Sequence, residues 1–328
     1  MKKIVYISLP NKNIIKVLKI TDNMLFETIQ NVKIFGNIQP IYICNKKKIL
    51  YVGVRKKNKI LTFDILKNGT LEEKTNINID YPSNHIHVNL KHKLLFSSSF
   101  HGNCLELYKI DKNYVPYKKI YTFTNIYGCH FSSVTKDNNF LFFTSLKKNK
   151  IYYFKMSNLN KINKNFISYI KLGKNFGPRH FVMHNNKEFI YVINELNGIV
   201  STIKIKKKIK VLQNIRLFPN KNKKFWSSEI EITPCNKYLY ASDRKINIIT
   251  SFKIEKKKFN LKFLKYYKTE CQPRTFRIDS SGKYLIVAGE KSNNITLYKI
   301  NKKNGDLTYL IKNFFVGGNP VWINFFDL

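Results

Sequence analysis

Residues 281–300 read SGKYLIVAGEKSNNITLYKI and contain the pattern that decides the fold. The polar turn SSGK at 280–283 precedes a short apolar run, LIV at 285–287, and a second run, NITLYKI at 294–300, follows it. Alternation of apolar and polar side chains, rich in Ile, Val and Tyr and interrupted by Asn, Lys and Gly, is typical of β-strands joined by turns. The stretch therefore predicts a pair of β-strands.

The same pattern recurs along all 328 residues. The apolar runs are VYI at 5–7, LYV at 50–52, LLF at 94–96, LFF at 141–143, IYV at 190–192, LYA at 239–241 and LIV at 285–287. They begin 45, 44, 47, 49, 49 and 46 residues apart, and a unit of about this size with four short strands is typical of a propeller blade. We predict an all-β fold, a seven-bladed β-propeller with four antiparallel strands per blade, as a single domain over residues 1–328.

The two ends of the chain supply parts of one blade. NPVWINFFDL at 319–328 looks like a first strand with no second strand behind it, and KIVYIS at 3–8 looks like a second strand with no first strand ahead of it. We expect these two strands to pair and close the ring. A two-domain β protein and a helical solenoid are the alternatives, and the solenoid lacks its amphipathic helical periodicity.

The formal net charge of +39 first suggests nucleic acid or an anionic membrane as a partner. The 53 Lys are accompanied by 40 Asn and 42 Ile, which indicates a compositional bias, and many of the lysines stand in short groups at expected turns. We therefore predict neither partner. Five cysteines without close spacing indicate free thiols and no metal site, the start of the chain is too short for a signal peptide, and no apolar run reaches membrane length. We expect a monomeric cytoplasmic protein.

Two columns of the repeat hold unusual side chains. Eleven residues before the apolar runs, at the start of the first strand of each blade, stand Gln39, Ser83, His130, Arg179, Ser228 and Arg274. Five residues after the beginning of each run, at the end of the second strand, stand Pro10, Arg55, Ser99, Leu146, Glu195, Arg244 and Glu290. Because the two strands are antiparallel, both columns meet at the same face of the disc.

Four of only six arginines in the chain fall in these columns: Arg55, Arg179, Arg244 and Arg274. A chain with 53 Lys that uses Arg here indicates a need for the planar fork that binds carboxylate or phosphate. We predict an anion-recognition site at the channel mouth, and salt bridges that only fix loops are the alternative. We interpret His180 and His184 as structural, and the chain has no G-x-S-x-G elbow for a serine nucleophile.

Several short motifs resemble one family over the whole length of the chain: GCH at 128–130, GPRH at 177–180, NEL at 194–196, QPR at 272–274 and SGKYLIVAGEKSNNI at 281–295. The resemblance is to the bacterial seven-bladed propeller lactonases, a family that includes the cytoplasmic 6-phosphogluconolactonases and a fungal carboxy-muconate cycloisomerase. A His, two Arg and a Glu are the proposed catalytic residues of that fungal enzyme. By motif, the resemblance implies catalytic roles for His130, Arg179, Glu195 and Arg274.

The resemblance implies hydrolysis of 6-phospho-D-glucono-1,5-lactone to 6-phosphogluconate, in the oxidative branch of the pentose phosphate pathway, with no cofactor. Arg55 and Arg244 are then candidates to bind the phosphate. His130 or Glu195 is the candidate general base, and a carboxylate between two guanidinium groups is a weak base, which favours His130. Arg179 and Arg274 would hold the oxyanion or the substrate. The alternatives are another lactonase, a lactone cycloisomerase, or a non-catalytic propeller that binds an anionic partner.

Overall fold

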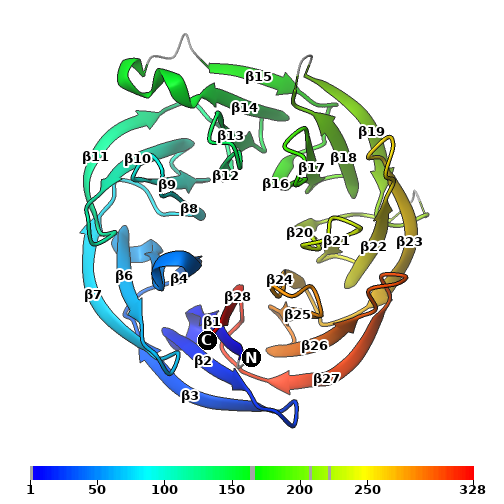
Figure 1. Cartoon of the computed structure of the whole chain (residues 1–328), viewed down its shortest axis with the longest axis horizontal. Coiled ribbons are helices and arrows are strands. Elements are labelled where there is room, and N and C mark those ends of the chain that lie inside the picture. Colours follow the sequence, from blue (N-terminus) through cyan, green and yellow to red (C-terminus); the bar gives the residue numbers. More distant parts are fainter. Residues whose placement is uncertain (1–2, 163–166, 207–208, 221–222) are drawn as a thin grey trace.

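The computed structural model describes residues 3–162, 167–206, 209–220 and 223–328. Seven four-stranded antiparallel sheets stand in a ring around a central axis (Figure 1). The seven-bladed β-propeller predicted from the repeat is therefore confirmed. No helix in the described ranges is long and apolar enough to cross a membrane.

Six blades take four consecutive strands each, ordered from the centre of the ring to its rim (Figure 1). Blades 1 to 3 consist of β4 (Ile38–Cys44), β5 (Ile49–Val54), β6 (Lys59–Ile65) and β7 (Leu71–Asn78); β8 (His85–Asn89), β9 (Leu94–Ser99), β10 (Cys104–Ile110) and β11 (Pro116–Phe123); and β12 (Cys129–Val134), β13 (Phe140–Ser145), β14 (Lys150–Lys155) and β15 (Ile167–Lys171). Blades 4 to 6 consist of β16 (Pro178–Met183), β17 (Phe189–Asn194), β18 (Ile199–Lys204) and β19 (Lys210–Arg216); β20 (Ser227–Ile232), β21 (Tyr238–Asp243), β22 (Ile248–Ile254) and β23 (Leu261–Lys268); and β24 (Pro273–Ile278), β25 (Tyr284–Gly289), β26 (Asn294–Ile300) and β27 (Leu307–Phe315). Short 3₁₀ helices are η1 (Pro10–Lys12), η2 (Asn45–Lys47), η3 (Arg55–Lys57) and η4 (Met156–Lys161).

Blade 7 is assembled from both ends of the chain, as the sequence predicts. Its strands are β28 (Trp322–Asp327), β1 (Lys3–Leu9), β2 (Ile14–Ile20) and β3 (Phe26–Lys33). β28 pairs antiparallel with β1, from Ser8 opposite Trp322 to Lys3 opposite Asp327, and the two termini lie side by side in Figure 1. The Lys3 ammonium also lies 2.6 Å from Asp327 and 2.7 Å from Asp279, so an ion-paired lysine joins blade 7 to blade 6.

The core consists of apolar clusters packed between neighbouring blades. In one of them, Tyr191 and Ile193 of blade 4 pack with Leu239 and Ala241 of blade 5, and all four are fully buried. Burying one large aliphatic side chain contributes about 1.5–3 kcal/mol, so these layers hold each blade against the next. The apolar runs read from the sequence are therefore the inter-blade contacts.

A β-bulge at the start of the innermost strand orients the residues at the channel mouth. In blade 4, Pro178 pairs with Asn194 and His180 pairs with Ile193, which leaves Arg179 without a cross-strand partner. Arg274 of blade 6 likewise has no cross-strand partner, because Pro273 pairs with Gly289 and Thr275 pairs with Ala288. The register also shifts at this point in blades 1, 3 and 5. Because a bulge turns the extra side chain away from the regular alternation, it re-aims these residues at the mouth.

Candidate active site

The two sequence columns meet through one recurring backbone hydrogen bond. The N–H of Glu195 donates to the carbonyl of Gly177, two residues before Arg179, at 2.8 Å. The N–H groups of Arg55, Arg244 and Glu290 donate to the equivalent carbonyls of blades 1, 5 and 6 at 2.9–3.0 Å. The end of each second strand is thereby tied to the start of the first strand, which brings both columns to one mouth of the channel.

Glu195 lies between two buried arginines. Its Oε2 is 3.0 Å from Nε of Arg179 and accepts a hydrogen bond of 2.8 Å from Nη2 of Arg244. The Arg244 guanidinium also stacks on the Trp226 ring, 3.8 Å from its centroid. Arg179 Nη1 donates to the Ser228 carbonyl at 2.7 Å. Blades 4 and 5 are therefore joined at the mouth by a fixed Arg–Glu–Arg arrangement.

Arg274 of blade 6 is held more loosely than these two arginines. Its Nη1 lies 3.4 Å from Glu290 and its Nη2 lies 3.4 Å from the Gln39 side-chain oxygen, which are long contacts. Arg55 makes one long hydrogen bond, from Nε to the Ser83 carbonyl at 3.4 Å. Both guanidinium groups therefore keep donors for another acceptor.

The mouth carries more positive than negative charge. Burial and the neighbouring Arg274 and Arg179 lower the pKa of Arg55 to about 10, and burial with Arg179 lowers that of Arg244 to about 9. Burial lowers the pKa of Arg179 to about 10, although Glu195 opposes the shift. All three remain protonated at neutral pH, so an anionic ligand would relieve their mutual repulsion.

His130 reaches the mouth from blade 3 through a contact that the sequence did not reveal. Its Nδ1 lies 3.1 Å from Nε2 of His180, which also lies 3.1 Å from Nη1 of Arg179. The other ring nitrogen of His180 lies 2.7 Å from Oε1 of Glu229. His130, Arg179 and Glu195 therefore belong to one connected cluster, and Arg274 acts on His130 and Arg179 through its charge from outside this cluster.

Sequence reasoning missed Glu229 and Trp226, and interpreted His180 as only structural. A signal was available, because His180 and Glu229 occupy the column one residue beyond Arg179 and Ser228. In a regular strand the side chains of His180 and Arg179 would point to opposite faces. The bulge lets the side chains of both columns reach the centre of the ring.

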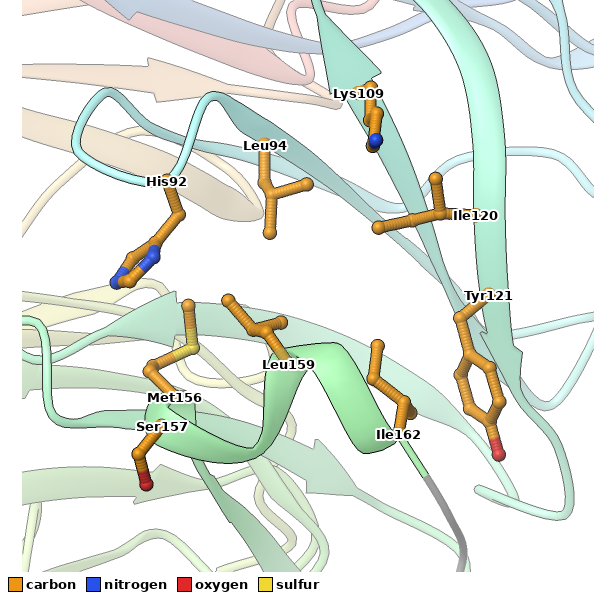
Figure 2. A pocket seen from close by; sticks show the side chains of 9 residues that line it. All are labelled: His92, Leu94, Lys109, Ile120, Tyr121, Met156, Ser157, Leu159 and Ile162. Carbon is orange, nitrogen blue, oxygen red and sulfur yellow. The ribbon is translucent and has the colours of Figure 1, made fainter.

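A separate cavity of about 680 Å³ lies between β10 and β11 on one side and η4 on the other. Figure 2 shows the side chains that line it, which include His92, Lys109, Met156 and Leu159. The described residues that line it include no carboxylate, no arginine and none of the residues at the mouth. We therefore place the candidate active site at the mouth.

The ring and its arginine-rich mouth define a seven-bladed propeller with a positively charged candidate site. Residues 4–325 match the family model of the lactonase seven-bladed β-propeller, and the chain belongs to this family. A 6-phosphogluconolactonase of Buchnera aphidicola subsp. Schizaphis graminum is 40% identical over 99% of both chains. The 6-phosphogluconolactonase of Serratia proteamaculans is 32% identical over 99% of both chains.

Solved structures of more distant proteins share the fold. The periplasmic gluconolactonase of Pseudomonas aeruginosa is 13% identical, with a TM-score of 0.87 over 100% of this chain and 99% of that chain. A protein from Bacteroides fragilis is 21% identical, with a TM-score of 0.88 over 99% of this chain and 98% of that chain. The resemblance to the propeller lactonases stated from the motifs is thus confirmed.

Proposed function

We propose that the protein hydrolyses 6-phospho-D-glucono-1,5-lactone to 6-phosphogluconate. The observation that carries the proposal is the charge of the mouth: Arg55, Arg179, Arg244 and Arg274 face two carboxylates, those of Glu195 and Glu290. Two positive charges are left uncompensated among these six side chains, which matches a phosphate dianion. The full-length likeness to 6-phosphogluconolactonases supports the same substrate.

Arg55 is the better supported of the two candidate phosphate ligands. Arg244 is already occupied by Glu195, by the carbonyls of Trp226 and Ser227, and by the Trp226 ring. Among the described residues Arg55 has one long hydrogen bond, and it stands at the start of η3. We therefore assign the phosphate to Arg55 and a supporting role to Arg244.

His130 serves as general base in this proposal, and Arg179 and Arg274 stabilise the oxyanion. The water loses a proton to His130 as its oxygen bonds to the lactone carbonyl carbon, and the carbonyl oxygen becomes an oxyanion. The oxyanion then re-forms the carbonyl, the bond to the ring oxygen breaks, and His130 returns the proton to that oxygen. Glu195 keeps Arg179 oriented, and both its contacts are to arginines, so it is poorly placed to accept a proton.

The proposal includes a monomeric enzyme of the cytoplasm that needs no cofactor. The five cysteines are all free thiols, and Cys44, Cys104 and Cys129 are buried, which suits a reducing compartment.

The decisive experiment measures hydrolysis of 6-phosphogluconolactone, generated in situ, with gluconolactone for comparison. We expect acceleration of the phosphorylated lactone by the wild type, and a loss of about 10²-fold or more in His130→Ala and Arg179→Lys. Arg216→Lys, on the outer strand of blade 4, is the matched control and should keep full activity. A wild type that adds nothing to the spontaneous rate would refute the proposal.

A further inference from the structure

Three buried side chains from three neighbouring blades form a hydrogen-bonded series that ends at the channel mouth. Glu229 of β20 contacts His180 of β16 at 2.7 Å, and His180 contacts His130 of β12 at 3.1 Å. Arg277 of β24 lies 2.9 Å from the other oxygen of Glu229. The mechanism proposed above gives a role to His130 but none to His180 and Glu229.

The position of the proton on His180 follows from Glu229. Burial disfavours the carboxylate, but the charge of Arg277 and the hydrogen bond from His180 outweigh burial and hold the pKa of Glu229 far below its usual range. An ionised carboxylate only accepts hydrogen bonds, so His180 must carry a proton on Nδ1. Burial lowers the pKa of His180 to about 4, so its ring is neutral and Nε2 keeps a lone pair. Arg179 aims Nη1 at that same nitrogen, as expected of a donor.

The position of the proton on His130 follows in turn. Its Nδ1 faces the lone pair of His180, so Nδ1 carries the proton and donates it. Burial, together with Arg179, His180, Arg274 and Arg244, lowers the pKa of His130 well below the usual range, so this ring is neutral as well. Nε2 is then unprotonated, and within the described residues it has no hydrogen-bond partner.

We infer that Glu229 and His180 are positioning residues, which fix His130 in the tautomer whose Nε2 accepts the proton of the attacking water. The inference rests on the proposed function for the reaction, whereas the tautomers follow from contacts within the protein. When Nε2 takes the proton, the imidazolium keeps its hydrogen bond to His180. Through this bond it is stabilised by the negative charge of Glu229.

Glu229→Gln tests this series because the charge of Arg277 favours one orientation of the amide. Oε1 of Glu229 faces His180 and the backbone N–H of Ile230 at 3.3 Å, whereas Oε2 faces the guanidinium of Arg277 at 2.9 Å and the hydroxyl of Thr275 at 3.5 Å. Because a hydrogen bond from a charged donor is the strongest of these contacts, we expect the amide oxygen to take the place of Oε2. The amide NH₂ then faces Nδ1 of His180 and donates to it. His180 then holds its proton on Nε2, Nη1 of Arg179 turns away from that nitrogen and keeps the Ser228 carbonyl as its acceptor, and His130 accepts a hydrogen bond from His180 at Nδ1. The proton of His130 therefore moves to Nε2, and the base is lost.

The experiment combines ¹⁵N NMR of the histidine rings, on the full chain without substrate, with lactone hydrolysis. We expect the wild type to carry the proton of both His130 and His180 on Nδ1, and Glu229→Gln to carry both on Nε2. The kcat for the phosphorylated lactone should fall about 10²-fold or more, with a small change in KM. His180→Phe removes the acceptor and should lose as much activity. His184→Phe, outside the series, is the matched control and should behave as the wild type.

Two results would overturn the inference. One is a wild-type His130 that carries its proton on Nε2. The other is full activity in Glu229→Gln or, if that variant does not fold, in His180→Phe. If the wild type hydrolyses neither lactone, the proposed function fails, while the tautomers measured without substrate still decide how His130 is held.

Discussion

Glu195→Gln keeps the shape of the side chain and removes the carboxylate that Arg179 and Arg244 share. The two guanidinium groups are only 2% and 3% exposed, and both lie within 3.0 Å of the same oxygen. Without that charge, two buried cations face each other across a neutral amide. Since removing one partner of a buried ion pair costs about 3–5 kcal/mol, we expect the free energy of unfolding to fall by about 3 kcal/mol. The corresponding fall in Tm is about 4 °C for a chain of this size.

Glu290→Gln is the matched control, at the same position of the repeat in blade 6. Its carboxylate contacts Arg274 at 3.4 Å, and the two side chains are 21% and 18% exposed. An ion pair of this kind contributes up to about 1 kcal/mol, so this variant should be close to the wild type. Denaturant unfolding of the three proteins at pH 7, followed by circular dichroism, measures the difference. Equal losses in both variants, or a Glu195→Gln protein as stable as the wild type, would refute the reasoning.

Three further predictions follow from single contacts. Arg55→Gln should raise the KM for the phosphorylated lactone about tenfold or more and leave the KM for gluconolactone unchanged, because a hydrogen bond to a charged group contributes about 1.5–3 kcal/mol. Steady-state kinetics that show equal effects on both substrates would contradict this. Gly53→Ala would place a Cβ 2.8 Å from the Gln39 carbonyl at the bulge of blade 1, so we expect thermal unfolding to show a loss of about 2 kcal/mol, and an unchanged Tm would disprove the steric conflict. Burial lowers the pKa of His87 to about 4, so between pH 6.5 and pH 4 the unfolded state binds a proton that the folded state does not, and the free energy of unfolding decreases as the pH decreases. Relative to His87→Phe, the wild type should lose about 2 kcal/mol of stability between pH 7 and pH 5. Parallel curves of stability against pH for the two proteins would contradict this.

The blades and the closure of the ring could be predicted because both depend on patterns that the sequence records directly. A strand that packs between blades needs apolar side chains, so the run LYA at 239–241 marks the position of Tyr240 and Ala241 in the core. The missing strands at the two ends implied the pairing of β1 with β28. Antiparallel pairing also placed Arg179 and Glu195 together before any contact was known.

The series behind His130 was missed because it depends on the bulges, although His180 and Glu229 share one column of the repeat. A shift of one residue in register moves a side chain to the other face of a strand, and the apolar pattern of the sequence does not predict where that shift occurs. His180 follows Arg179 directly, and a regular strand would send the two side chains to opposite faces. The bulge lets both reach the channel, where Arg179 and His180 contact each other at 3.1 Å. A histidine that reads as structural from its position in a strand thereby becomes the link between a buried carboxylate and the mouth.

The use of arginine at the mouth follows from the number of directions in which each side chain must bind. Nε of Arg179 faces the Glu195 carboxylate, and its Nη1 faces both a backbone carbonyl and the His180 ring. Arg244 contacts the same carboxylate, two backbone carbonyls and an aromatic ring. The single ammonium of a lysine has no second nitrogen for such divergent contacts and cannot stack as a plane. The abundant lysines add long-range attraction for an anion, which raises the rate of encounter without fixing an orientation. In the proposed reaction the lysines therefore set the field around the disc, and the few arginines define where in that field the anionic substrate would be held.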